Sequence, residues 1–112
     1  MIIWSTKLFL GDSIKEKKLK KVKKKIEKPN KIRFGAYLIT LNTNGSDLLD
    51  IYNIMFFPAK HFKKKDYDVK IVGVAGGADE AQELAGGMIA RFMKEGFPLT
   101  PDGIRGYFKE CF

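Results

Sequence analysis

The chain has 112 residues, of which 45% are hydrophobic and 30% are charged, and its net charge is +8. This length suits one domain and excludes two ordinary domains joined by a linker, and the composition excludes a disordered chain. A single cysteine, Cys111, excludes an internal disulfide and a cysteine-based metal cluster. We therefore expect one folded domain over residues 1–112.

The first ten residues form an apolar run that ends at Gly11 and Asp12, which predicts a strand followed by a turn. Lys7 interrupts the run, no basic region precedes it, and no small-residue cleavage site follows it. We therefore expect neither a signal peptide nor a membrane-spanning helix, and we expect a cytoplasmic protein.

Residues 13–28 are predicted to form a lysine-rich helix. Ser13 and Glu16 have the spacing of a capping box, in which the serine hydroxyl accepts the Glu16 amide and the Glu16 carboxylate accepts the Ser13 amide. Pro29 ends the helix, because the residue before a proline avoids the α region. A narrow apolar seam repeats at helical spacing and consists of Leu19, Val22 and Ile26.

The middle of the chain is predicted to form three strands. Residues 32–41 and 50–57 are rich in β-branched and aromatic side chains. The polar segment between them contains the turn signal Asn44-Gly45, so together they indicate a hairpin. Residues 60–68 then form a basic loop, and residues 69–75 form the next strand.

Two helices are expected after this strand. Asp79 is a favourable N-cap for a helix over residues 79–96, and Gly96 suits its C-terminal cap. The apolar positions of that helix are Ala81, Leu84, Ala85, Met88, Ile89 and Phe92. Gly86 and Gly87 inside it indicate close approach of the sheet or of a partner helix. A short helix with Thr100 as N-cap and Pro101 as first residue carries Ile104, Tyr107, Phe108 and Cys111 on one face.

The resulting order, β-α-β-β-β-α-α, indicates an α+β domain with a largely antiparallel sheet of about four strands and helices packed on it. Both faces of the predicted strands carry apolar side chains, as in residues 34–41 and 51–57. Either the helices divide between the two faces, or a second copy of the chain covers one of them. Because fourteen aromatic residues occur in so short a chain, we expect a homodimer.

Residues 1–31 contain eleven lysines and three carboxylates and so carry the whole net charge. Their lysine-rich helix is either a solvated structural helix or a surface that binds nucleic acid, an acidic protein or a membrane. It contains no arginine, so binding to nucleic acid would be weakly specific. Its narrow seam also lacks the broad apolar face of a membrane-surface helix, and we expect no membrane partner. The candidate nucleic-acid-binding residues are Lys17, Lys20, Lys21, Lys24, Lys25, Lys63 and Lys64.

Lys63 and Lys64 belong to a second basic cluster, residues 60–65, in which Phe62 could stack on an unpaired base. A polar connection between strands is the competing interpretation of this cluster. If the cluster folds beside the lysine-rich helix, the two would form one basic surface.

Gly76 and Gly77 join a strand to a helix N-terminus, where free amides favour anions. Their spacing fits neither a dinucleotide fingerprint nor a phosphate-binding loop. Asp79, Glu80 and Glu83 would also repel a phosphate at this point. Anion binding at Gly76 and Gly77 is therefore a second alternative beside a tight strand-to-helix connection.

The sequence shows no catalytic constellation. His61 is the sole histidine and lies among lysines, Cys111 has no candidate base nearby in the sequence, and Asp66 and Asp68 are flanked by lysines. We therefore expect a non-enzymatic binding or accessory domain that acts through a protein partner or self-association. We expect no cofactor and no metal.

Residues 13–93 follow the order α-β-β-β-α, and in this they resemble the double-stranded RNA-binding domain. In that family the last helix opens with a lysine pair that holds phosphates. Asp79 and Glu80 stand at these positions here, so the resemblance implies the topology rather than RNA binding.

A further resemblance is to short uncharacterised proteins of anaerobic Gram-positive bacteria. It is carried by residues 37–41, 48–51 and 71–75, followed by Glu80-Ala81 and Glu83-Leu84. It implies a bacterial, cytoplasmic origin and a shared fold.

Overall fold

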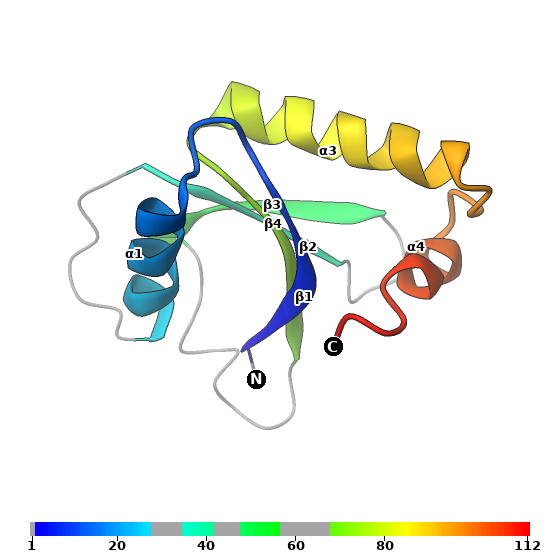
Figure 1. Cartoon of the computed structure of the whole chain (residues 1–112), viewed down its shortest axis with the longest axis horizontal. Helices are drawn as coiled ribbons and strands as arrows, with labels where there is room; N and C mark the ends of the chain where they lie inside the picture. Colours follow the sequence, from blue (N-terminus) through cyan, green and yellow to red (C-terminus); the bar gives the residue numbers. More distant parts are fainter. Residues whose placement is uncertain (1, 28–34, 42–47, 57–67) are drawn as a thin grey trace.

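The computed structural model describes residues 2–27, 35–41, 48–56 and 68–112 (Figure 1). The elements in chain order are β1 (Ile2–Leu10), α1 (Glu16–Glu27), β2 (Tyr37–Leu41), β3 (Leu49–Asn53), the 3-10 turn η1 (Ile54–Phe56), β4 (Val69–Ala75), α3 (Ala78–Lys94) and α4 (Pro101–Tyr107). This confirms the predicted α+β class and the order β-α-β-β-β-α-α.

The four strands form one mixed sheet in the order β1-β4-β2-β3. β2 is antiparallel to both of its neighbours, whereas β1 is parallel to β4, so the sheet is mostly antiparallel as predicted. β4 lies inside the sheet, and every residue of it except the half-buried Lys70 is buried. A strand that is apolar on both sides needs a packing layer on each face of the sheet.

The helices supply both layers (Figure 1). α1 packs on one face, where its seam meets residues of β2 and β4, and α3 and α4 pack on the other. The pairing of β2 with β4 contains a bulge between Ile39 and Thr40, which shifts the alternation of side chains along β4. As a result, Ile71 and Val74 both face α1, whereas Val72 faces α3. The helices therefore divide between the two faces, and the homodimer remains a prediction.

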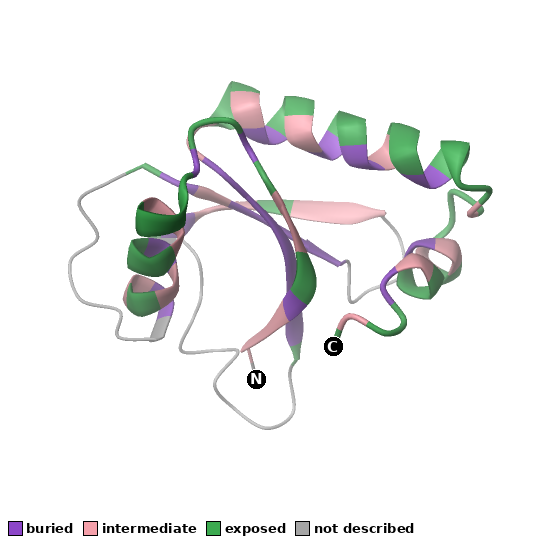
Figure 2. Ribbon diagram, viewed as in Figure 1, coloured by how far each residue is buried: buried purple, intermediate pink, exposed green. Residues whose placement is uncertain are grey.

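Burial follows this layered arrangement (Figure 2). On the α1 side the buried core consists of Ile14, Val22, Ile26, Ala36, Leu38, Ile54, Ile71 and Val74. On the other side it consists of Ile39, Leu41, Val72, Ala85, Met88, Phe92, Ile104 and Phe108. Phe108, the residue that follows α4, is part of this second core and stands edge-to-face to Phe92 with their centroids 5.8 Å apart.

The second strand of the hairpin is shorter than predicted. The strand expected over residues 50–57 ends at Asn53, and η1 follows it. The side-chain oxygen of Asn53 accepts the Met55 amide at 3.0 Å, and the Ile54 amide donates to the Ala36 carbonyl at 2.9 Å. These bonds turn Ile54 into the core, and this packing overrides the β-propensity of the segment. Of the strand expected over residues 32–41, the structure describes Tyr37–Leu41, and residues 32–34 lie outside the described part.

The helix ends confirm two caps and correct one. Gly96 has φ +84°, and the amides of Gly96 and Phe97 donate to carbonyls of the last turn of α3, which is a Schellman motif. The Thr100 hydroxyl accepts the Gly103 amide at 3.0 Å and caps α4 as predicted. α3, however, begins after Gly77 rather than after Asp79.

The structure contradicts one of the two expectations for Gly86 and Gly87, because neither glycine lies against the sheet. Both are exposed, and a Cβ added to either would meet nothing within 4 Å. They lie on the side of α3 opposite its buried residues Ala81, Ala85, Met88 and Phe92. The glycine pair therefore has no packing role within the described part of the chain.

These glycines give a matched pair of stability predictions. Gly96→Ala should lower the free energy of unfolding by about 1–2 kcal/mol, because only glycine adopts a positive φ without steric cost. Gly86→Ala should raise it by about 0.5–1 kcal/mol, because alanine restricts the unfolded chain and has open space in α3. Urea denaturation at low micromolar protein measures both changes. A Gly86→Ala variant less stable than the wild type would contradict the exposed position of Gly86.

Candidate functional site

The outward side of α1 carries a group of exposed lysines, here named the lysine face: Lys17, Lys20, Lys21 and Lys24. Their spacing of i, i+3, i+4 and i+7 places all four on one side of the helix. Over these positions the helix rises by about 10 Å. The lysine face is therefore a short linear array of positive charge directed into solvent.

The apolar seam fixes the direction of this face. Val22 and Ile26 are 0% and 2% exposed and pack in the core on the α1 side of the sheet, with the partly buried Leu19 beside them. The flanks of α1 are also engaged, since the Lys23 ammonium lies 5.2 Å from the centre of the Trp4 ring. Because the opposite side of the helix is buried, the lysine face cannot rotate inward without exposing the core.

The charges of the lysine face are poorly balanced within the described chain. Lys20 pairs with Glu16 at 3.7 Å, but both side chains are highly exposed, and such pairs contribute about 0.3–0.5 kcal/mol. Lys17 with Lys21, and Lys20 with Lys24, are like charges at i, i+4, each pair costing about 0.2–0.5 kcal/mol. A polyanion bound here would relieve that repulsion.

The predicted nucleic-acid-binding residues do not all come together. Lys25 lies on the flank of α1, half-buried and in contact with other groups, rather than on the lysine face. Lys63 and Lys64, with the rest of the 60–65 cluster and His61, lie outside the described residues. The site as the structure describes it is thus the lysine face of α1.

The predicted anion site at Gly76 and Gly77 contains a carboxylate of the chain itself. Glu80, in the first turn of α3, reaches back and accepts the Gly76 amide. The same carboxylate accepts the Ser13 amide at 2.9 Å and the Ser13 hydroxyl at 2.7 Å. An anion bound at Gly76 would have to displace it.

This contact also corrects the predicted capping box of α1. The carboxylate that receives the Ser13 amide comes from Glu80, and α1 begins only at Glu16. Its first turn is closed by the amide of Leu19 donating to the Lys15 carbonyl at 2.9 Å. The spacing of Ser13 and Glu16 did not reveal this, because Glu80 is 67 residues away from Ser13. The local sequence signal for this contact is the position of Glu80, since a glutamate three residues after an N-cap reaches back to backbone amides at the start of the helix.

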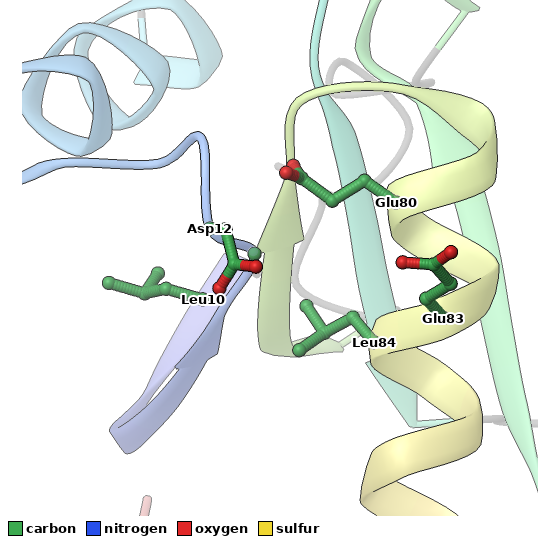
Figure 3. A pocket seen from close by; sticks show the side chains of 6 residues that line it. Leu10, Asp12, Glu80, Glu83 and Leu84 are labelled. Carbon is green, nitrogen blue, oxygen red and sulfur yellow. The ribbon is translucent and has the colours of Figure 1, made fainter.

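Two glycines leave room for the contact. A Cβ at Gly76 would overlap the Ser13 hydroxyl, and a Cβ at Gly11 would overlap the Glu80 carboxylate. Beside it is a hollow of about 200 Å³, in which Glu80 and Glu83 of α3 lie near Asp12 of the β1–α1 turn (Figure 3). The hollow is acidic, and among the described residues no group of three or more His, Cys, Asp or Glu is arranged to hold a metal ion.

The remaining candidate residue is Cys111. It is partly buried and packs against the core formed by α3 and α4, and its carbonyl accepts the Thr6 amide of β1 at 2.8 Å. This position agrees with the role of a small apolar side chain. None of the described helices is long and apolar enough to cross a membrane.

The Glu80 contact predicts a pH-dependent stability. Hydrogen bonds from the Ser13 hydroxyl, the Gly76 amide and the Ser13 amide hold the pKa of Glu80 below its usual range. A carboxylate whose pKa is lowered by folding stabilises the fold fully above its unfolded pKa and loses this effect as the pH falls through its folded pKa. Glu80→Gln should therefore lower the free energy of unfolding at pH 7 by about 0.5–1 kcal/mol, since water reaches the group.

The difference between wild type and Glu80→Gln should disappear at acid pH, as measured by urea midpoints between pH 7 and pH 3. Glu83→Gln is the control, because Glu83 is an exposed neighbour on α3 without a hydrogen bond among the described ones. Equal midpoints for the two variants at pH 7 would show that the contact does not stabilise the fold.

Comparison with known proteins adds no family to this picture: no protein-family model, curated protein or solved structure matches the chain. A function is therefore argued from the placement of side chains. Among the described features, the lysine face combines exposure, a fixed orientation and unbalanced charge.

Proposed function

We propose that the chain is a non-enzymatic binding domain whose lysine face binds the phosphate backbone of nucleic acid with little sequence preference. The observation that carries this proposal is the exposed array of Lys17, Lys20, Lys21 and Lys24, held outward by the buried seam of α1. Neutralising phosphates with lysines releases condensed counterions, which favours binding at low salt.

The dimensions and chemistry of the lysine face support a backbone contact. An array about 10 Å long covers the axial rise of about three nucleotides of one strand of a duplex. Each ammonium acts as a point charge, and α1 contains no arginine, whose planar fork binds guanine or phosphate through two parallel hydrogen bonds. The expected binding is therefore weak in specificity and strong in salt dependence.

The structure favours nucleic acid over a membrane as the partner of this surface. A membrane-surface helix inserts its apolar side among the acyl chains. In α1 the apolar residues Val22 and Ile26 are buried against the sheet and cannot be inserted. An acidic protein is the other polyanion that could use the lysine face.

Two double variants with equal charge test the proposal. Lys20→Gln with Lys24→Gln removes two charges from the lysine face, whereas Arg105→Gln with Lys109→Gln removes two exposed charges outside α1 and α3. Binding is measured by fluorescence anisotropy over a salt series, with a labelled duplex or single strand at nanomolar concentration and the protein titrated through the micromolar range. The first variant should reduce the slope of log K against log salt by about 1.4–1.8, and the control by much less.

The assay uses two unrelated base sequences, each as a duplex and as a single strand. Within each of these two forms, both sequences should bind with similar affinity. No binding at low salt, or an equal loss in both double variants, would overturn the proposal. Binding of polyglutamate but not of nucleic acid would assign the lysine face to an acidic protein instead.

A further inference from the structure

A second surface lies on α3, on the side that faces away from the sheet. Its residues follow helical spacing and are all exposed: Asp79, Glu83, Gly86, Gly87, Ala90 and Lys94. The exposed side runs along the whole helix (Figure 2). We name this surface the α3 face.

Charge is divided along the α3 face. Asp79 and Glu83 occupy its N-terminal half, and Lys94 occupies its C-terminal end, with Arg91 on the adjoining flank, where it pairs with Glu95 at 3.2 Å. The centre is uncharged. A surface that is acidic at one end and basic at the other is complementary to itself when turned end for end.

The centre of the α3 face also permits a close approach. Gly86 and Gly87 lower the stability of the helix and gain no contact within the described chain, since a Cβ at either position has open space. Ala90 extends the small surface by one turn. Another helix could approach the backbone here more closely than it could over longer side chains.

We propose that the α3 face is a self-docking surface, on which a second copy of the chain packs its own α3 in antiparallel orientation. With the two-fold axis between Gly86 and Gly87, Asp79 of each copy lies opposite Lys94 of the other. A parallel arrangement would instead place Asp79 against Asp79. In the antiparallel pair the two helix dipoles also point in opposite directions, so that the partial positive end of each helix lies beside the partial negative end of the other.

One helix face buries a small area, below the roughly 1,200 Å² of a standard stable interface. The dimer should therefore be weak, with a dissociation constant of about 10 µM to 1 mM. The proposal does not rest on nucleic-acid binding, because it involves no residue of the lysine face.

Charge reversal tests the orientation as well as the association. Asp79→Lys gives a copy with lysine at both ends of the α3 face, and Lys94→Glu gives a copy with carboxylates at both ends. Each variant alone should dimerise about tenfold more weakly than the wild type, because like charges then meet across the axis. An equimolar mixture should form a heterodimer with an affinity near that of the wild type, since both charge pairs are restored.

Analytical ultracentrifugation up to about 1 mM protein measures these constants, and circular dichroism shows that each variant is folded. Glu110→Lys and Lys109→Glu are the matched controls, because they make the same charge changes on exposed residues outside α3. Each control should self-associate like the wild type, and mixing them should give no gain. A wild type that stays monomeric, single variants that dimerise as it does, or a mixture no stronger than its components would each overturn the proposal.

Discussion

β4 carries apolar side chains toward both faces of the sheet, and both sets must be kept from water. This requirement accounts for the helix on each side. α1 carries like charges at close spacing along its outward side, so the burial of Val22 and Ile26 must outweigh their repulsion. The same burial places the lysine face in solvent. On the other side, α3 and α4 cover Val72 with a core of aromatic and aliphatic residues.

The Glu80 contact connects these two layers near the point where each begins. Ser13 precedes α1, and Glu80 lies in the first turn of α3, so their hydrogen bonds join the starts of two helices that pack on opposite faces of the sheet. The carboxylate also satisfies the Gly76 amide, one of the free donors before α3. A feature that looked like a place for an external anion is thus part of the internal structure.

The parts of the fold that were predicted from the sequence are those set by local signals. β4 is bounded by residues 69–75 as expected, the cap at Thr100 depends on residues 100–103, and the turn at Gly96 needs only the conformational freedom of glycine. The errors fall where distant contacts decide. The Ala36 carbonyl accepts the Ile54 amide where a β-rich segment becomes η1, and Glu80 takes the bond assigned to Glu16. The outward lysine face could be derived from the seam of α1, and the spacing of Ala85, Met88 and Phe92 in the same way turns Gly86 and Gly87 away from the sheet.

The two proposed surfaces belong to opposite layers of the molecule. α1 packs on one face of the sheet, and α3 packs on the other with its exposed side turned away (Figure 2). Docking of two copies through α3 would therefore leave both lysine faces accessible. Two weak contacts on one nucleic acid strengthen each other through the effective concentration of the second site, provided that the strand can reach both. A domain with one short array of lysines would in this way gain affinity from self-association, without any residue that reads the base sequence.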